Sequence, residues 1–307
     1  MEKEEIKTMD NFSVSLPNGK VWQGRSFPVE GAKQNILILT GMCEYAARYE
    51  PFASFLNKHG FNVCVLDAMG QGLNSKSVDV QQKVNKGDFE DNIVAAHLKL
   101  EEMKANGLPT SIMGHSMGSF MTQYFLECYP GTCNKVILCG SNGGQAGLMR
   151  MAKFLVNIHV RKGNWDKPSK FFTDLGLGSY IKAIKNRKTD LDWLSYDEAN
   201  IAAYAADPYC GVTNTNGFWR EFLNGMAKIW TKKYTSKVST DERILMISGQ
   251  EDPVGQNGKG LIALKKQYEK IGVREATLIL YPHMRHEILN ETDKVRVWND
   301  VLDFLEK

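Results

Sequence analysis

The 307-residue chain lacks several features that would assign it to a specialised class of protein. No apolar run approaches the roughly 20 residues that a membrane-spanning helix needs. The net charge of +3 is too small to indicate nucleic-acid binding, and no internal repeat or low-complexity tract is present. A hydrophobic content of 43% is typical of an ordinary globular protein.

Cysteine is also used sparingly. The six cysteines, at positions 43, 64, 128, 133, 139 and 210, do not show the paired spacing of a zinc site. Cys64 and Cys139 lie inside apolar runs, where a free thiol behaves as a small hydrophobic group. Residues 1–7 are charged and lack the apolar stretch of a secretory signal. We therefore expect a cytoplasmic protein without disulfides, metal ions or cofactors.

Short apolar runs alternate with helical patterns along the chain. Residues 12–16 and 21–29 predict a hairpin around Asn18-Gly19. Six further runs predict strands buried on both faces: residues 36–39, 61–66, 111–113, 136–139, 244–247 and 276–280. Helices are predicted over residues 88–105, with Asp88 as N-cap, and over 119–129, 259–271 and 293–306. This alternation predicts an α/β fold with a doubly wound, mostly parallel sheet.

The alternation stops between residues 141 and 242, where the pattern is helical and no strand is evident. The sequence therefore predicts a core made of residues 1–140 and 243–307, with residues 141–242 inserted between two strands. Such an insertion should lie at the carboxyl edge of the sheet, where open α/β sheets bind their ligands. We expect it to act as a helical lid.

The segment Gly114-His115-Ser116-Met117-Gly118 follows one predicted strand and opens a predicted helix. This G-x-S-x-G order is typical of a nucleophile elbow, a tight turn that exposes a serine hydroxyl above the end of a sheet. Glycine is needed on both sides because closely packed backbones leave no room for a Cβ atom. The pentapeptide alone is equally compatible with an ordinary Gly/Ser loop. In this context we interpret Ser116 as a nucleophile.

A serine nucleophile needs a base, and the base needs a carboxylate that orients it. In this type of fold both follow later strands, in the order acid and then histidine. Asp252 follows the run at 244–247, and His286 follows the run at 276–280. We predict that these two residues are the acid and the base, with Glu251 and His283 as the alternatives.

The tetrahedral intermediate of acyl transfer requires backbone N–H donors. One donor should be Met117, the residue after the nucleophile, and the other should come from the loop after residues 36–39. Met42 is the candidate in that loop, and Gly41 lets the chain approach the substrate closely.

Five segments together resemble the α/β-hydrolases of the monoacylglycerol lipase and bacterial lysophospholipase kind, S33-type hydrolases, over nearly the whole chain. The segments are residues 41–49, 67–72, 114–118, 249–253 and 286–291. The resemblance implies the α/β-hydrolase fold with a helical lid. It also implies a catalytic triad of Ser116, Asp252 and His286, with Met42 and Met117 forming the oxyanion hole.

The chain departs from the family pattern at three positions near the nucleophile. Thr40 stands where the family usually has histidine, and Ala68 and Gln71 replace the two histidines of the second segment. None of the three belongs to the implied triad. The substitutions indicate a rearranged neighbourhood under the elbow. Glu44 and Arg48, four residues apart, are expected to form an exposed, structural ion pair.

Residues 148–188 of the insertion carry ten Lys/Arg and two Asp around an amphipathic stretch. Such a segment can cover the pocket as a plain lid, contact an anionic membrane surface transiently, or bind a partner protein. The aromatic content of the insertion predicts an apolar acyl substrate, with Phe218 and Trp219 as substrate-binding residues.

These observations predict a serine hydrolase that cleaves carboxylic esters, such as lysophospholipids or monoacylglycerols, through an acyl-enzyme. A serine peptidase of the proline-iminopeptidase kind is an alternative, because one fold hosts both activities. That activity would require an acidic site in the lid to hold the substrate amine. A non-catalytic binding protein on the same scaffold is the alternative from a different class.

Overall fold

An eight-stranded sheet lies at the centre of the computed structural model, which describes residues 9–133 and 135–307. The N-terminal segment that we expect to lack a secretory signal lies outside the described residues. The strands are β1 (Asp10–Ser15), β2 (Val21–Phe27), β3 (Gln34–Leu39), β4 (Phe61–Leu66), β5 (Thr110–His115), β6 (Lys135–Cys139), β7 (Arg243–Gly249) and β8 (Glu275–Tyr281). Their order across the sheet is β1-β2-β4-β3-β5-β6-β7-β8.

The sheet is antiparallel only at its first edge. β1 and β2 form the predicted hairpin, and β2 pairs antiparallel with β4. All further pairs, from β4 through β3 to β8, are parallel. The carboxyl ends of the parallel strands therefore share one edge of the sheet.

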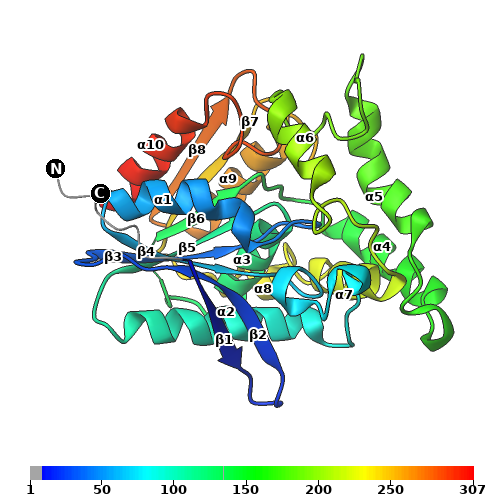
Figure 1. The fold of residues 1–307 in the computed structure, drawn as a ribbon, viewed down its shortest axis with the longest axis horizontal. Coiled ribbons are helices and arrows are strands. Elements are labelled where there is room, and N and C mark those ends of the chain that lie inside the picture. The colour runs from blue at the N-terminus through cyan, green and yellow to red at the C-terminus, as the bar shows by residue number, and fades with distance from the viewer. Residues whose placement is uncertain (1–8, 134) are drawn as a thin grey trace.

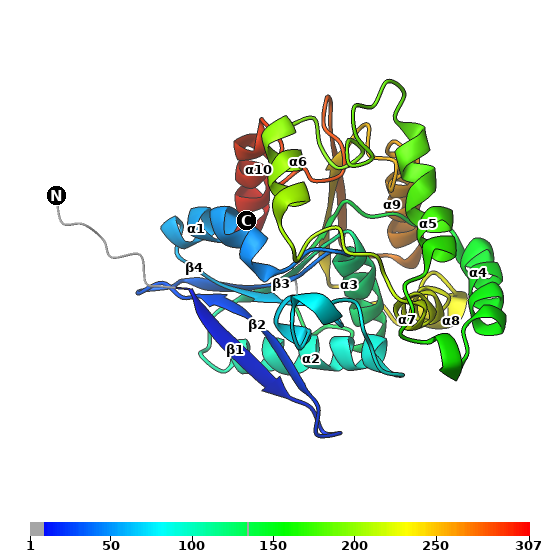
Figure 2. The same ribbon diagram turned by 45° about the vertical axis from the view of Figure 1, so that its right-hand side comes forward.

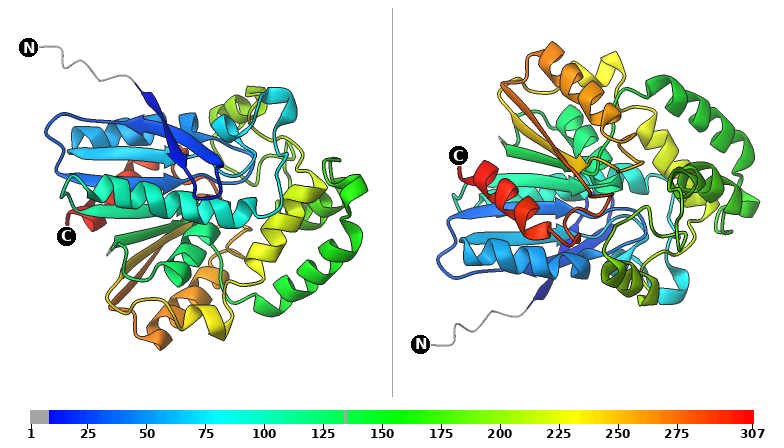
Figure 3. Two further views of the ribbon diagram at one scale, coloured as in Figure 1. Left: turned by 90° about the horizontal axis from the view of Figure 1, so that it is seen from below. Right: turned by 90° about the horizontal axis from the view of Figure 1, so that it is seen from above.

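Helices cover both faces of the sheet (Figure 3). α1 (Glu50–Lys58) and α10 (Lys294–Glu306) share one hydrophobic cluster with one face. α2 (Asp88–Lys104), α3 (Met117–Cys128) and α9 (Lys259–Ile271) share a second cluster with the other face. This architecture confirms the predicted doubly wound α/β fold.

The start of α2 differs from the prediction. Gly87, with φ of 92°, occupies the N-cap position, and Asp88 is the first helical residue. The Asp88 carboxylate accepts a hydrogen bond from the Asn85 N–H at 2.6 Å, upstream of the helix. Asp88 as N-cap was therefore wrong, because its side chain binds the preceding loop instead of the first turn.

Five helices lie between β6 and β7, over the carboxyl ends of the strands (Figures 1 and 2). They are α4 (Ala146–His159), α5 (Lys170–Ala183), α6 (Glu198–Ala206), α7 (Asn216–Met226) and α8 (Lys232–Thr235). Short 3₁₀ turns lie at Ala46–Tyr49, Gly72–Asn74, Val78–Val80 and Lys162–Asn164. Val156, Phe172 and Phe218 of these helices are buried in the same cluster as α2 and α3, which anchors the insertion on the core. Within the described residues, no helix has the length and apolar character needed to cross a membrane.

Candidate active site

Ser116 lies at the sharp turn between β5 and α3. Its φ of 52° and ψ of −120° are strained for a residue with a side chain, and such strain is typical of functional turns. A Cβ atom on Gly114 would lie 2.2 Å from the Gly118 carbonyl oxygen, and one on Gly118 would lie 2.1 Å from the Leu39 carbonyl oxygen. Both glycines are therefore required by close backbone packing. The segment has the conformation expected of a nucleophile elbow.

Asp252 and His286 meet at the same edge of the sheet, in the loops that follow β7 and β8. His286 Nδ1 lies 3.0 Å from Asp252 Oδ2, and both side chains are buried. Burial alone would raise the pKa of Asp252, but His286 and hydrogen bonds from Ser248 Oγ and the Val254 N–H bring it below its ordinary value. These contacts favour the charged form of the Asp252 carboxylate, which orients the imidazole.

The alternative acid and base lie elsewhere. The side chain of His283 is 94% exposed and lies 3.7 Å from Glu251, whose own side chain is 45% exposed. Neither residue lines the cavity that contains Ser116. Of the candidates, the structure brings Asp252 and His286 together and leaves Glu251 and His283 at the surface.

A cavity of about 300 Å³ joins the candidate residues under the insertion. Ser116, His286 and Gly41 line it, together with side chains from α3 through α7, most of them apolar. The cavity is also lined by Met42, Met117, Trp219, Phe120, Met149, Leu177, Tyr180, Ile181, Trp193, Phe222, Leu223, Met226 and Trp230. Phe218, by contrast, is fully buried in the core and does not line the cavity. The expected contact between Phe218 and substrate is therefore corrected. Phe218 points from α7 into the core, whereas its neighbour Trp219 reaches the cavity.

Two backbone donors border the same cavity. Met117 opens α3, so its N–H has no partner within that helix. Met42 lies in the loop after β3. Within the described part of the chain, neither the Met42 N–H nor the Met117 N–H donates to a backbone or side-chain acceptor. Both donors are therefore available to an oxygen atom placed beside Ser116.

A buried cluster of charges lies directly behind the candidate base. The Arg48 guanidinium contacts Glu44 at 2.9 Å and Glu287 at 2.7 Å, and His115 Nδ1 lies 3.0 Å from Glu44. His115 Nε2 in turn lies 3.3 Å from the carbonyl oxygen of His286. Glu44 is 4% exposed, so the expected exposed ion pair with Arg48 was wrong. The tertiary structure folds the insertion and the last loop over this pair.

The cluster is ionised despite its burial. Burial would raise the pKa of Glu44 and of Glu287, but His115 and Arg48 lower the first and Arg48 lowers the second. Burial would lower the pKa of His115, and the Glu44 carboxylate raises it above its ordinary value. Arg48 therefore favours the charged form of both carboxylates, and the Glu44 carboxylate favours the protonated form of His115.

Sequence reasoning did not place Trp193 or Ser248 beside the candidate acid and base. The Trp193 ring lies 5.1 Å from the His286 ring, centroid to centroid. Ser248 Oγ donates to Asp252 Oδ2 at 2.8 Å. Ser248 follows the predicted strand and could have been noticed there, whereas Trp193 reaches the site through the fold of the insertion. Within the described residues, no three His, Cys, Asp or Glu side chains are grouped as a metal site requires.

The family follows from comparison with known sequences. The family model described as "Serine aminopeptidase, S33" matches residues 30–293, which include all the loops of the site. The chain belongs to this family. This membership confirms the prediction of a hydrolase. The family model leaves only residues 1–29 and 294–307 of the chain unmatched.

Curated relatives of this S33 hydrolase include two lipases. The monoglyceride lipase of Saccharomyces cerevisiae is 25% identical over 89% of this chain and 84% of its own. The monoacylglycerol lipase of Mycolicibacterium smegmatis is 24% identical over 88% and 87%, respectively. Lysophospholipase L2 of Escherichia coli is 26% identical over 60% of this chain and 54% of its own. These relatives confirm the predicted resemblance.

Solved structures agree with the fold. A carboxyl esterase from Bacillus coagulans superposes with a TM-score of 0.84 at 25% identity, covering 97% of this chain and 98% of its own. A soluble variant of the Saccharomyces cerevisiae monoglyceride lipase gives a TM-score of 0.75 at 20% identity, covering 98% and 97%. The α/β-hydrolase fold is confirmed.

Proposed function

We propose that this S33 hydrolase cleaves carboxylic esters of fatty acids through an acyl-enzyme on Ser116. In the first step Ser116 Oγ attacks the ester carbonyl carbon while His286 Nε2 takes the hydroxyl proton. The negative charge on the carbonyl oxygen is stabilised by the N–H groups of Met42 and Met117. Asp252, bonded to His286 Nδ1 at 3.0 Å, stabilises the resulting imidazolium.

The second half of the reaction uses the same groups. Collapse of the tetrahedral species breaks the ester C–O bond, and His286 gives its proton to the departing alcohol. A water molecule, deprotonated by His286, then attacks the acyl carbon, the bond from this carbon to Ser116 Oγ breaks, and Oγ takes the proton back from His286 as the fatty acid leaves. The observation that carries the proposal is the single apolar cavity that Ser116 and His286 both line, with a buried carboxylate bonded to the histidine.

The charge of the cavity favours a neutral substrate of the monoacylglycerol type over a lysophospholipid. Among the described residues that line it, none is lysine or arginine, so the wall offers no cation to a phosphate. Four carboxylates line it as well, and all are already paired: exposed Asp174 and Asp190 with Lys170 and Arg187, and buried Glu44 and Glu287 with Arg48. They are poor holders of the substrate amine that a peptidase would require.

Labelling with a fluorophosphonate probe tests the nucleophile. We expect the folded wild-type protein and a Ser179→Ala control, altered at an exposed serine of α5, to be labelled, and Ser116→Ala to remain unlabelled. Absence of labelling in the folded wild type would favour a non-catalytic binding protein and overturn the proposal.

A substrate panel tests the leaving group. The panel contains four compounds, each assayed separately in the same buffer: monooleoylglycerol, oleoyl lysophosphatidylcholine, oleoyl lysophosphatidylglycerol and proline anilide. We expect the highest kcat/KM for monooleoylglycerol. A preference for either phospholipid would contradict the argument from cavity charge, and a preference for the anilide would replace the esterase by the peptidase.

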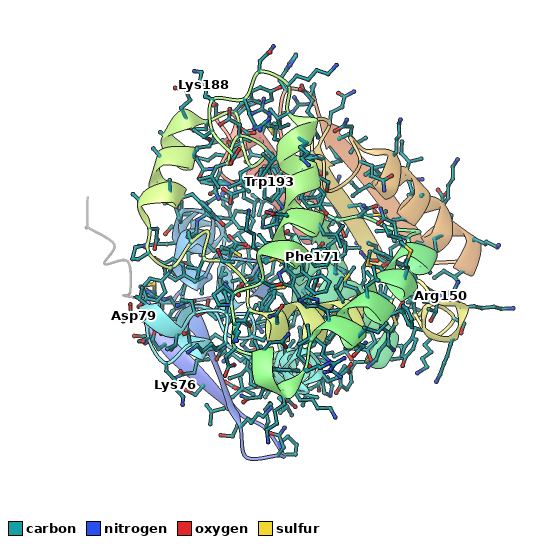
Figure 4. All side chains as sticks on the ribbon, turned by 90° about the vertical axis from the view of Figure 1, so that its right-hand side faces the viewer. Lys76, Asp79, Arg150, Phe171, Lys188 and Trp193 are labelled. Carbon is teal, nitrogen blue, oxygen red and sulfur yellow. The ribbon has the colours of Figure 1, made fainter. Side chains whose placement is uncertain are left out.

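We further propose that residues 141–242 act as a lid whose outer face contacts an anionic lipid surface. Among the described residues, eight of the eleven exposed large hydrophobic side chains lie there, and seven of the eight belong to two helices: Leu148, Met151, Phe154, Leu155 and Ile158 on α4, and Phe171 and Leu175 on α5. Exposed Arg150, labelled in Figure 4, lies among them on α4, as does exposed Lys153 in the same helix. Apolar groups flanked by cations suit an anionic interface. The same two helices line the cavity through Met149, Leu177 and Tyr180, so substrate can pass from the lipid into the site.

Vesicle sedimentation tests this contact. We expect binding to phosphatidylcholine vesicles that contain phosphatidylglycerol, weaker binding to pure phosphatidylcholine, and loss of binding in Phe154→Asp. Val295→Asp, at a comparably exposed apolar residue of α10, is the matched control and should bind as the wild type. A Phe154→Asp variant that binds normally, or that only converts a dimer into a monomer, would contradict the proposal.

The six free cysteines fit a reducing, cytoplasmic setting.

A further inference from the structure

The side chain of Gln71 is buried against the loop that carries Met42. Gln71 Oε1 accepts a hydrogen bond from the Cys43 N–H at 2.7 Å. Gln71 Nε2 donates to the carbonyl oxygen of Gly41 at 2.8 Å and to that of Glu44 at 3.1 Å. Gln71 itself is 1% exposed, so these bonds do not compete with water.

These bonds act on the two peptide units that flank the Met42 Cα atom. The Gly41 carbonyl and the Met42 N–H belong to one planar, trans peptide unit, in which they point in opposite directions. Holding the Gly41 oxygen on Gln71 therefore turns the Met42 N–H toward the opposite side. The next peptide unit is held through the Cys43 N–H. One amide side chain thus fixes both rotations about Met42.

Further contacts hold the same loop from the other side. The Glu44 carboxylate accepts from the Gly41 N–H at 2.6 Å and lies 3.0 Å from His115 Nδ1, next to the nucleophile. Gln82 Nε2 donates to Gln71 Oε1 at 3.2 Å and sets the orientation of the Gln71 amide, whose oxygen faces two donors and whose nitrogen faces two acceptors.

We propose that Gln71 is a positioning residue that aims the Met42 N–H at the developing oxyanion through its bonds to Gly41 and Cys43. The proposal rests on the function assigned above to Ser116 and Met42. Because an amide does not titrate, Gln71 holds the loop in the same way at every pH at which the fold is stable. Donation to the Gly41 carbonyl also polarises the Met42 N–H and strengthens it as a donor.

Gln71→Glu keeps the size of the side chain but replaces an amide group with two donor protons by a carboxyl group with one or none, so the bond to the Glu44 carbonyl and the bond to Gly41 cannot both form. The introduced carboxyl group can still accept from Cys43, but it donates to Gly41 only when it is protonated. Burial should raise its pKa toward neutrality. We therefore expect the ratio of variant to wild-type kcat to fall with rising pH, from near 1 at pH 5.5 to about 0.1–0.01 at pH 8.5, since displaced donors typically cost such factors. KM should change by less than about threefold, because the loop acts in the transition state.

Other titratable groups lie in, or hydrogen-bond to, the two segments that Gln71 connects, and the ratio of variant to wild type removes the titration that they contribute to both proteins. They are Cys43 and Glu44 in the loop after β3, Asp67 in its own segment, and Tyr204 of α6, which donates to the Cys43 carbonyl. Burial raises the pKa of Asp67 to about 7, so the wild type itself can titrate near neutrality. All four groups are present in both proteins.

Asn35→Asp is the matched control. Asn35 lies near the start of β3, at the opposite end of the strand from the loop that carries Met42. Its buried amide also donates to a carbonyl, that of Met103, at 2.9 Å. The control should lose stability without a pH-dependent change in the kcat ratio. If Gln71→Glu fails to fold, Gln71→Met, which keeps the size of the side chain without its hydrogen bonds, should lower kcat about tenfold or more at every pH.

Two results would overturn the inference. One is a kcat ratio for Gln71→Glu that does not vary with pH, and the other is unchanged kcat in Gln71→Met. Either result with an active, probe-labelled wild type would leave the proposed hydrolase intact and remove only the role of Gln71. Failure of the hydrolase itself would show as an unlabelled wild type.

Discussion

Replacing Arg48 by methionine should destabilise the protein strongly, because it unbalances the buried charge cluster. The guanidinium bonds both oxygens of Glu287 at 2.7 Å and one oxygen of Glu44 at 2.9 Å. Methionine fills much of the same volume but leaves two buried carboxylates without their guanidinium partner. Breaking a buried ion pair from one side costs about 3–5 kcal/mol of unfolding free energy. We expect a loss of that size for Arg48→Met at pH 8.

The loss should shrink as the pH falls. In the wild type the pKa values of Glu44 and Glu287 are lowered by folding, so their stabilisation is present above the ordinary carboxyl pKa and is lost as pH falls through the folded values. Without Arg48, burial dominates and raises a carboxyl pKa in the folded variant. That group can then be protonated at pH 5.5, which relieves part of the repulsion. The difference between variant and wild type should therefore be smaller at pH 5.5 than at pH 8.

Urea unfolding at the two pH values measures both effects. Arg187→Met is the control, because Arg187 makes a comparable pair with Asp190 at 3.2 Å, but on the surface. The control should change the unfolding free energy by less than about 1 kcal/mol at either pH. The reasoning is refuted if Arg48→Met costs no more than Arg187→Met at pH 8, or if its cost grows toward acid.

Three further predictions concern the site. Asp252→Asn should fold normally and lower kcat by about 10⁴, measured with monooleoylglycerol, because the imidazole loses its orienting charge; a loss below tenfold would count against the acid. Gly118→Ala should lower kcat more than about 100-fold because its Cβ atom would meet the Leu39 carbonyl oxygen at 2.1 Å, whereas Gly147→Ala, with open space around it, should keep full activity. His283→Gln should leave the pH profile of kcat unchanged, and a shifted profile would move the base from His286.

The fold was predictable because its signals are local. The apolar runs that became β3 to β8 are too short and too rich in branched residues for helices, and their alternation with helical patterns indicates a parallel sheet. The start of α2 was not predictable in the same way. Asp88 is a favourable N-cap in isolation, but its carboxylate binds the Asn85 N–H of the preceding loop and the Lys20 ammonium, and Lys20 reaches it only through tertiary structure.

The candidate site, like the fold, was predictable from the sequence only in part. The positions of Ser116, Asp252 and His286 after successive strands follow from order along the chain, and their catalytic roles stay a prediction until they are tested. Trp219 and Phe218 are adjacent in sequence and both aromatic, yet only Trp219 lines the cavity. Which of the two residues lines the cavity depends on how α7 is oriented against its neighbours. The aromatic composition of the segment does not encode that orientation.

By itself the sequence determined the α/β fold and the elbow around Ser116, because a glycine on each side of a serine and the order of strands and helices are written in consecutive residues. Only the tertiary structure decided what surrounds them. Gln71 holds Gly41 and Cys43, and Arg48 holds Glu287, which lies 239 residues further along the chain. Hydrogen bonds and burial depend on distance in space, and for these residues that distance is set by the packed sheet and the helices inserted over it.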